Sequence, residues 1–411
     1  MKNQFLQFPS GFLWGAATSA HQVEGDNKNS DWWAWEPGHV KNGEVSGKSG
    51  DQYHLFEEDF NLVKKLNHNA HRLSIEWARI EPEQGKFDQT EIEHYRKVLT
   101  SLKEKNIKVM LTLHHFTNPM WFYKLDGWEK RENLKYFVRY AELVAKELGS
   151  LVDFWITINE PLVYVDESYF RATRPPQKKS YWLGYMVLRN MAHAHRQVYQ
   201  AIHRVIPFAQ VGVAHNVSSI QAYRKHSWKD QFIELLIDKA VNHHFLNLAG
   251  MDCQDFLGLN YYQHVRIRKT EKTRLVFDQA DAMDKDTNDM GWEIYPHGIF
   301  NMLLDLSDYN KPIYITENGL AADDDTVRQR FIVGYLKEIY HAIKAGVDVR
   351  GYFHWSLLDN FEWDHGFNPR FGLIHIDYQT FKRTAKPSAE LYAKIIEQNG
   401  LGKEEMKYLG Y

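Results

Sequence analysis

The sequence predicts an α/β fold, a single (β/α)8 barrel of the TIM type that spans residues 1–411. Eight short segments rich in apolar and β-branched residues alternate with amphipathic segments, which is the pattern of parallel strands joined by crossover helices. No Gly-x-Gly-x-x-Gly turn follows any of these strands, which disfavours the competing doubly wound sheet. The chain contains no Pro/Gly/Ser-rich linker and no low-complexity tract, so one domain is the simplest organisation.

The expected strands and helices follow one another in a regular order along the chain. The strands are placed near residues 12–18, 70–77, 108–115, 153–159, 210–215, 256–261, 312–317 and 349–355. The clearest helix lies between Leu134 and Leu148, where apolar residues recur at spacings of three and four. Further helices are expected near residues 326–344 and 387–398. Catalytic side chains are expected at the C-terminal ends of the strands, as in other barrels of this type.

Composition and charge exclude several classes of function. The 411 residues are 44% hydrophobic and 25% charged, as is usual for a soluble globular protein. The net charge of −3 gives no reason to expect nucleic acid or an anionic membrane as a partner. Cys253 is the only cysteine, so an intramolecular disulfide is excluded. No segment has the length and hydrophobicity of a signal peptide or a transmembrane helix, and we expect a cytoplasmic protein.

Two glutamates occupy the ends of predicted strands. Glu160 follows the apolar run 154–158, and Glu317 follows the run 312–316. Cleavage of a glycosidic bond requires two carboxyl groups on rigid elements, one to protonate the leaving oxygen and one to attack or stabilise the anomeric carbon. Each glutamate could instead be a strand-end charge in a salt bridge. The presence of both, together with the residues below, favours the catalytic interpretation.

Other strand ends carry amides, imidazoles and aromatic residues, a mixture that suits a ring of sugar hydroxyls better than a phosphate. These candidate site residues are Gln22, Arg72, His115, Asn159, Asn260, Tyr262, Trp355, Glu362 and Trp363. For several of them a structural role is the alternative: neutralisation of a buried acid for Arg72, and packing in the core for Trp355. His114 and His115 are adjacent on a strand and point to opposite faces, so we expect no metal there.

The chain resembles glycoside hydrolase family 1, the β-glucosidase/β-galactosidase group of retaining (β/α)8 hydrolases. The stretches that carry the resemblance span almost the whole sequence. They are Phe12-Leu13-Trp14-Gly15-Ala16-Ala17-Thr18-Ser19-Ala20-His21-Gln22-Val23-Glu24-Gly25, Thr157-Ile158-Asn159-Glu160-Pro161, Thr316-Glu317-Asn318-Gly319, Trp355-Ser356-Leu357-Leu358-Asp359-Asn360-Phe361-Glu362-Trp363 and Arg370-Phe371-Gly372. Asn-Glu-Pro alone is a weak signal, because several barrel glycosidase families share it. The ordered set is specific.

The resemblance implies a role for each candidate. Glu160 would be the general acid/base and Glu317 the nucleophile, with their carboxyl groups about 5–5.5 Å apart in a retaining enzyme. It implies that the hydrogen-bond partners of the non-reducing sugar are Gln22, His115, Asn159, Glu362 and Trp363, with Trp355 beneath the ring. Arg72, Asn260 and Tyr262 would surround the nucleophile. No cofactor is implied, because these side chains complete the chemistry. Glu160 should have a raised pKa, so that it arrives protonated.

Three features depart from the family pattern. The segment 169–176 lacks the usual Gly-rich and Ala-Pro-Gly elements, and the regions after Glu317 and from 216 to 232 are shorter than usual. We therefore expect an open acceptor site with loose selectivity for the leaving group. His354 replaces a residue that is commonly small, and the sequence assigns it no role.

The sequence thus predicts a retaining β-glycosidase that hydrolyses terminal β-D-glucosyl residues, with β-D-galactosyl or β-D-fucosyl residues as secondary substrates. Glu362 can accept a hydrogen bond from either orientation of the 4-hydroxyl, so the sugar preference stays open. A 6-phosphorylated substrate is disfavoured, because the Glu362 carboxylate would repel it. Two alternatives remain, a transglycosylase and a non-catalytic sugar-binding barrel.

Overall fold

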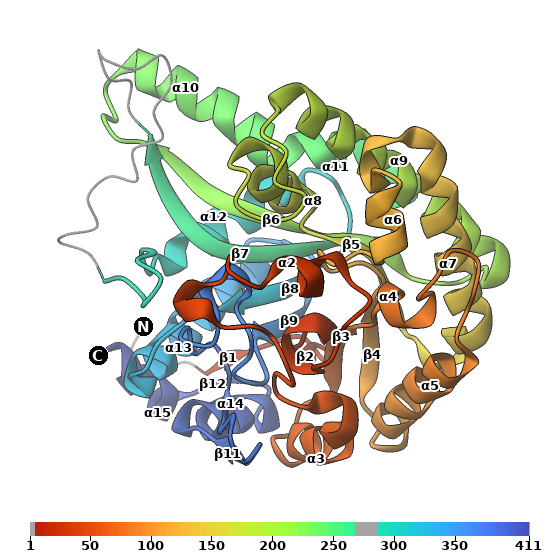
Figure 1. Ribbon diagram of the computed structural model, residues 1–411. Coiled ribbons are helices and arrows are strands. Elements are labelled where there is room, and N and C mark those ends of the chain that lie inside the picture. Colours follow the sequence, from red (N-terminus) through yellow and green to blue (C-terminus); the bar gives the residue numbers. More distant parts are fainter. Residues whose placement is uncertain (1–4, 268–285, 411) are drawn as a thin grey trace.

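A computed structural model describes residues 5–267 and 286–410, and its centre is the expected closed barrel of parallel strands (Figure 1). Neighbouring strands follow one another in chain order around the barrel, and β9 closes it against β2. The eight strands are β2 (Leu13–Ala17), β3 (Ala70–Ser74), β4 (Lys108–Thr112), β5 (Phe154–Asn159), β6 (Val211–Ala222), β7 (Phe256–Ile267), β8 (Ile313–Gly319) and β9 (Val349–Trp355). The predicted (β/α)8 architecture is confirmed.

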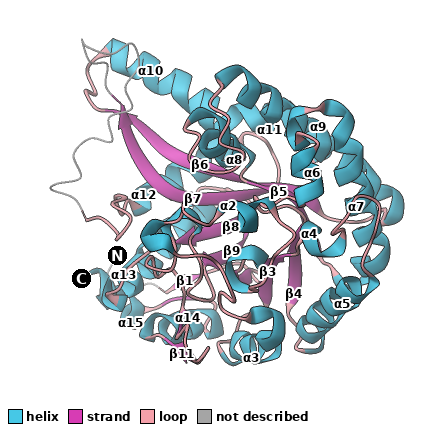
Figure 2. Cartoon of the chain, viewed as in Figure 1, coloured by secondary structure: helices cyan, strands magenta, loops and turns pink. Residues whose placement is uncertain are grey.

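Helices surround the strands on the outside of the barrel (Figure 2). The longer ones are α3 (Gln52–Lys65), α5 (Gln89–Glu104), α7 (Leu134–Leu148), α9 (Tyr181–Val205), α10 (Trp228–Asp238), α12 (Pro296–Ser307), α13 (Asp325–Lys344) and α14 (Pro387–Glu397). Short helices are α1 (Ala20–Val23), α2 (Asp31–Trp35), α4 (Trp77–Ile80), α6 (Met120–Lys124), α8 (Pro161–Val165), α11 (His244–Ala249) and α15 (Lys403–Met406). The three helices predicted from periodicity correspond to α7, α13 and α14.

Two apolar layers hold this arrangement together. A smaller cluster takes one or more side chains from every strand and packs inside the barrel. Its members include Ala17, Ala70, Met110, Ile156, Ala214, Phe256, Tyr314 and Phe353. A larger cluster fills the space between the strands and the helices, where α7 buries Phe137, Ala141 and Val144 on one face. The three-and-four spacing of the α7 sequence therefore marks its buried face.

Two short antiparallel strand pairs lie outside the barrel. β1 (Leu6–Gln7) pairs with β12 (Gly400–Leu401), which brings the two ends of the chain close together (Figure 1). β10 (Ile374–Ile376) pairs with β11 (Arg383–Ala385). In the described ranges, 5–267 and 286–410, no helix has both the length and the apolar character that a membrane span requires.

The predicted bounds of four strands were wrong. β3 ends at Ser74 and β4 at Thr112, three residues earlier than expected in each case. β6 and β7 are longer than expected and pair with each other as far as Ala222 and Ile267. Polar residues in 216–222 had the appearance of a loop, but their backbone groups are satisfied by this pairing.

Candidate active site

Glu160 and Glu317 lie at the C-terminal ends of β5 and β8, two strands that β6 and β7 separate in the barrel. Glu160 directly follows β5 and precedes α8, with its backbone in the left-handed region at φ +45°. Glu317 lies near the end of β8. Both are buried, with 7% and 3% of their surface exposed. A left-handed backbone at a residue other than glycine is strained, and such strain is concentrated at functional sites.

Each oxygen of the Glu317 carboxylate has a donor. Arg72 contacts Oε1 through Nη1, and the Tyr262 hydroxyl donates to Oε2 at 2.7 Å. Arg72 is itself fixed, because Nη1 also donates to the Thr316 carbonyl at 3.2 Å and Nη2 donates to Asn159 Oδ1 at 2.7 Å. Glu317 therefore has a defined orientation and a cation to balance its charge.

A bulge between β6 and β7 places Tyr262 in the site. Val217 pairs with Tyr261, but the next residue, Ser218, pairs with Gln263, so Tyr262 is the extra residue of β7. A bulge changes the direction in which a side chain points. Here the bulged residue is the one whose hydroxyl reaches the carboxylate of Glu317.

Glu160 has a different environment, in which its partners are neutral amides. Asn260 Nδ2 donates to Glu160 Oε1 at 2.9 Å, and Asn216 Nδ2 donates to the same atom at 3.2 Å. Burial raises the pKa of Glu160 to about 7, and the negative charge of Glu317 acts in the same direction. At neutral pH a large share of Glu160 is protonated, whereas Glu317 is paired with an arginine.

Asn159 connects the surroundings of the two glutamates. Its Oδ1 accepts hydrogen bonds from Arg72 and from Asn260 Nδ2, the latter at 3.1 Å, and its own amide nitrogen lies 3.3 Å from His115 Nε2. Thr316 Oγ1 donates to Asn260 Oδ1 at 2.6 Å, which fixes the orientation of that amide. Hydrogen bonds from four strands therefore set the positions of these side chains relative to one another.

One side of the site is built from stacked rings. His115 lies nearly parallel to Trp355 and to Trp363, with centroid distances of 5.9 and 6.1 Å. Trp363 also stacks on His21, with an angle of 8° between the planes. Burial lowers the pKa of His115 well below its usual value, so the imidazole is neutral. This side offers aromatic faces and uncharged nitrogens.

Gln22 and Glu362 form a second polar group next to the rings. Gln22 Nε2 donates to Glu362 Oε2 at 3.2 Å and to Asn360 Oδ1 at 2.9 Å. Burial raises the pKa of Glu362 to about 8, against the lowering effect of the Arg174 charge. Gln22 Oε1 and His115 Nδ1 are buried and have no hydrogen-bond partner among residues 5–267 and 286–410. Buried polar atoms without partners at one site are the groups that a hydroxyl-rich ligand can satisfy.

The structure therefore brings together all the site residues expected from the sequence. His354 lies apart from them, on the opposite face of β9 from Trp355. Its ring is 6.3 Å from the ring of Tyr392 in α14, and its Nδ1 lies 3.4 Å from the Tyr352 hydroxyl. It is fully buried, and burial lowers its pKa well below the usual value. His354 packs as a neutral ring between the barrel and α14.

Sequence analysis missed two residues of the site, Asn216 and Arg174. Asn216 contacts Glu160 but was assigned to a loop, because β6 was expected to end at residue 215. Arg174 forms an ion pair with Asp364 at 2.8 Å and influences Glu362 through its charge. No local pattern identifies Arg174, since it lies far along the chain from both acids.

Known proteins are similar to this chain over most of its length. The model of the family described as Glycosyl hydrolase family 1 matches residues 4–249 and 239–401. Beta-glucosidase A of Acetivibrio thermocellus is 32% identical, over 96% of this chain and 99% of its own. A beta-galactosidase of Pyrococcus woesei is 29% identical, over 97% of this chain and 98% of its own.

Solved structures show the same fold. The beta-glycosidase from Pyrococcus horikoshii has a TM-score of 0.92 at 37% identity and covers 99% of both chains. The family 1 β-glucosidase from Thermotoga maritima, in complex with isofagomine lactam, has a TM-score of 0.91 at 29% identity, over 97% of this chain and 100% of its own. The chain therefore belongs to glycosyl hydrolase family 1, and it is an O-glycosyl hydrolase of the β-glucosidase/β-galactosidase type.

Proposed function

We propose that this enzyme is a retaining β-glycosidase in which Glu317 is the nucleophile and Glu160 the general acid/base. The observation that carries the proposal is the contrast between the two carboxyl groups. Glu317 is balanced by Arg72 and accepts a hydrogen bond from Tyr262. In the part of the chain that the structure describes, the Glu160 carboxyl group instead accepts from two amides, and its pKa is raised to about 7. Two carboxyl groups with opposed environments are typical of an ionised group and a proton donor that work together.

In the first step, a Glu317 oxygen attacks the anomeric carbon and forms an ester bond to it. The bond to the aglycone oxygen breaks, and that oxygen takes the proton of Glu160. In the second step, water attacks the same carbon while Glu160 takes a proton from the water, and the ester bond to Glu317 breaks. Glu317 is then free again and Glu160 is protonated again, so the cycle closes without a cofactor. Two inversions give a product that keeps the β configuration.

The non-reducing sugar would occupy the space between the glutamates and the aromatic side. In this proposal its hydroxyls bind Gln22, His115, Asn159, Glu362 and Trp363, and its ring lies on Trp355. Two buried atoms without a partner in the described ranges support it. A sugar hydroxyl can donate to Gln22 Oε1 and can accept from His115 Nδ1, which carries the proton because Nε2 accepts from the Asn159 amide. Relatives solved in complex with glucoimidazole and with deoxynojirimycin also support a glycoside substrate.

A β-D-glucoside is the proposed preferred substrate, with galactosides and fucosides as secondary ones. Similar proteins include both β-glucosidases and a β-galactosidase, and Glu362 can accept from an axial or an equatorial 4-hydroxyl. The raised pKa of Glu362 weakens the argument from charge against a phosphorylated sugar, because repulsion becomes full only above about pH 8. Comparison of kcat/KM for glucoside, galactoside, fucoside and 6-phosphoglucoside at pH 6 and pH 9 would rank the four.

Transglycosylation is the second candidate activity, and it rests on the acceptor side. β6 leads into α10 through the short connection 223–227, so this part of the chain supplies only a short loop to the proposed acceptor side. An open acceptor side would admit alcohols or sugars as well as water. Product analysis with added methanol or glucose would measure the share of transfer. A structure with a deep, walled aglycone cleft would contradict the open acceptor side.

The partner expected from this proposal is a small β-glycoside or an oligosaccharide. Nucleic acid and membranes are not expected as partners, on the basis of net charge, and a cytoplasmic location remains a prediction.

The retaining mechanism is tested by NMR of the first product released from an aryl β-D-glucoside. Initial appearance of β-glucose supports retention, and initial appearance of α-glucose contradicts it. A non-catalytic barrel would release no product.

The role of Glu160 can be tested separately with Glu160→Ala. If Glu160 protonates the leaving oxygen, its removal should slow cleavage of alkyl glucosides far more than formation of the glycosyl-enzyme from a dinitrophenyl glucoside. A dinitrophenolate leaves without a proton, so its first step does not need the acid. An equal loss for both substrates would contradict the assignment.

A further inference from the structure

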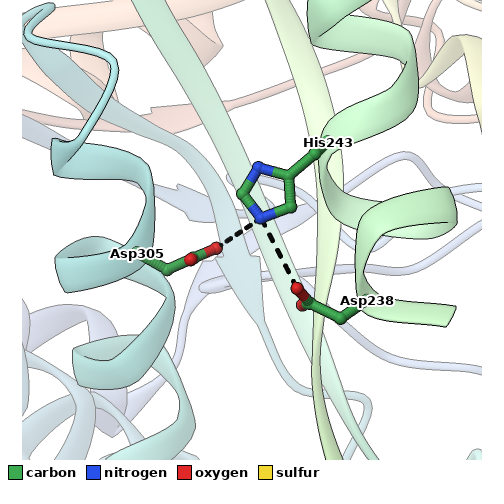
Figure 3. Close-up of side chains that lie close together, drawn as sticks. All are labelled: Asp238, His243 and Asp305. Atoms are coloured by element: carbon green, nitrogen blue, oxygen red, sulfur yellow. Dashed lines mark ion pairs between the residues drawn. The ribbon is translucent and has the colours of Figure 1, made fainter. Parts of the chain in front are cut away.

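Three potential metal ligands meet on the outer helices of the barrel, apart from the glutamates of the active site. Asp238 ends α10, His243 ends the following turn η6 (Lys239–His243), and Asp305 lies on α12. Their side chains point towards one another (Figure 3). His243 Nε2 is 2.7 Å from Asp305 Oδ2 and 3.6 Å from Asp238 Oδ2, and the three ligand atoms lie within 4.8 Å of one another.

Two of these atoms form ion pairs but make no hydrogen bond of good geometry with any residue in the described ranges. His243 is only 5% exposed, and its Nε2 makes no hydrogen bond of good geometry. Asp305 Oδ2 is also buried and makes none. The two aspartate side chains keep 20% and 31% of their surface exposed, which leaves a path from solvent. A buried nitrogen directed between two carboxylates is the arrangement of a cation site.

Neighbouring residues hold the ligands in this orientation. His243 Nδ1 lies 2.9 Å from the Tyr309 hydroxyl, which donates its own proton to Asn247 Oδ1 at 3.2 Å. Since the hydroxyl proton is used, Nδ1 is the atom that carries hydrogen, and the lone pair of a neutral imidazole is on Nε2. Asn242 donates to Asp238 Oδ1 at 2.8 Å. Such outer contacts, which fix tautomer and carboxylate orientation, are common around protein metal ions.

We propose that Asp238, His243 and Asp305 bind one divalent transition-metal ion of the Zn²⁺ type, with water as a further ligand. Zinc binds imidazole nitrogen and carboxylate oxygen at about 2.0–2.2 Å, so two of its ligands in a tetrahedron lie roughly 3.3–3.6 Å apart. The two separations from His243 Nε2, 2.7 and 3.6 Å, lie below this range and at its upper end. The imidazole ligand favours Zn²⁺, Co²⁺ or Ni²⁺ over Mg²⁺ and Ca²⁺.

The bound ion would connect the end of α10 to α12. Both helices contact β6, and α12 and α10 have no covalent link near this point. The ion would therefore stabilise the outer layer beside β6 and leave the reaction at the glutamates unchanged. This inference is independent of the proposed glycosidase mechanism.

An ion triad without metal is the competing interpretation. The nearby carboxylates of Asp238 and Asp305 raise the pKa of His243 to about 9, so the metal-free imidazole is charged at neutral pH. Lys239 also approaches Asp238, with Nζ 3.8 Å from Oδ2. A metal ion must displace the proton from His243, which makes binding weaker as the pH falls. Measurements are therefore best made at pH 8.

The test uses the full chain without an affinity tag, treated with EDTA and desalted. Zn²⁺ and Mg²⁺ are titrated by calorimetry, and thermal unfolding is followed with each ion. The variants are Asp305→Asn and His243→Gln, and the matched control is His297→Gln, which removes an exposed imidazole that faces one carboxylate, Glu338. Co²⁺ absorption reports the ligand geometry directly.

We expect about one Zn²⁺ per chain, no comparable binding of Mg²⁺, and a Tm that rises by roughly 3 °C at a hundredfold excess over Kd. His297→Gln should keep the Zn²⁺ binding and the rise in Tm. Asp305→Asn and His243→Gln should lose both, while their circular dichroism and glycosidase activity stay unchanged. If the native chain shows no saturable Zn²⁺ site, the proposal is wrong. Equal binding by folded Asp305→Asn or His243→Gln would overturn it as well. Should either variant fail to fold, the native titration and the Co²⁺ spectrum decide alone.

Discussion

Arg72 and Glu317 form an ion pair that is almost completely shielded from solvent, with 1% and 5% of their side chains exposed. The two residues come from β3 and β8, and Arg72 also contacts Asn159 at the end of β5. One arginine thus connects the proposed nucleophile to the strand that carries the proposed acid. This contact explains why a charged side chain is tolerated inside the mouth of the barrel.

Replacement of Arg72 by methionine should reduce both stability and activity. The Glu317 carboxylate would remain buried without its cation, which costs about 3–5 kcal/mol. Unfolding in urea and kcat/KM on an aryl glucoside measure the two effects. Arg383→Met is the control, because Arg383 forms a fully buried pair with Asp59 away from the site. The control should lose stability but keep its activity per folded molecule; an equal loss of activity would contradict the role of Arg72.

Tyr262→Phe should slow the reaction without unfolding the protein. The substitution removes the hydroxyl that donates to Glu317 Oε2, a hydrogen bond to a charged group. Such a bond contributes about 1.5–3 kcal/mol, which corresponds to a loss of roughly ten- to hundredfold in kcat/KM. Tyr261→Phe is the matched control, since its hydroxyl contacts the Tyr295 carbonyl instead. Similar losses in the two variants would argue against a direct role for Tyr262.

The pH profile should report the proton on Glu160. If Glu160 must be protonated to act as the acid, kcat/KM falls as the pH rises above about 7. The hydrogen bond from Asn216 lowers the pKa of Glu160, so Asn216→Ala should move the basic limb to higher pH. A basic limb that stays in place or moves to lower pH would contradict this assignment.

Stability should depend on pH through the same residue. The folded pKa of Glu160, about 7, exceeds its ordinary value of 4.5, so the folded state binds the proton more tightly than the unfolded state. Stability from this group is fully present below pH 4.5 and is lost as the pH rises through 7. Relative to Glu160→Gln, the native chain should therefore lose up to roughly 3 kcal/mol across this window. Chemical unfolding at pH 5, 6, 7 and 8 measures the difference, and a constant difference would refute the raised pKa.

The sequence predicted the barrel because its strands are short apolar runs separated by amphipathic helices, as in Leu134–Leu148. It was less successful where tertiary contacts decide the structure. The polar stretch after residue 215 forms a strand only because β7 pairs with it, and the bulge that orients Tyr262 depends on the same pairing. Local sequence contains neither piece of information.

The same distinction applies to the site. The two glutamates and most of their partners lie at strand ends, where the fold brings them together, so their positions follow from the barrel. Arg174 influences Glu362 through a contact that no spacing encodes. His354 could not be assigned from its neighbour Trp355, because adjacent strand residues face opposite sides. The group of Asp238, His243 and Asp305 was equally hidden, since its members come from α10, from η6 and from the distant α12.

The most direct test of the central claim compares nitrophenol release from an aryl β-D-glucoside by the native chain and by Glu317→Gln. Glutamine keeps the shape of the side chain but cannot form the ester that the proposed mechanism requires. Glu338→Gln serves as the control, because that carboxylate lies on α13 and faces His297. The account predicts rapid release by the native chain and by the control, and a loss of several orders of magnitude in folded Glu317→Gln. Release by Glu317→Gln within about tenfold of the native rate would contradict it, because tenfold corresponds to only about 1.4 kcal/mol in the activation free energy.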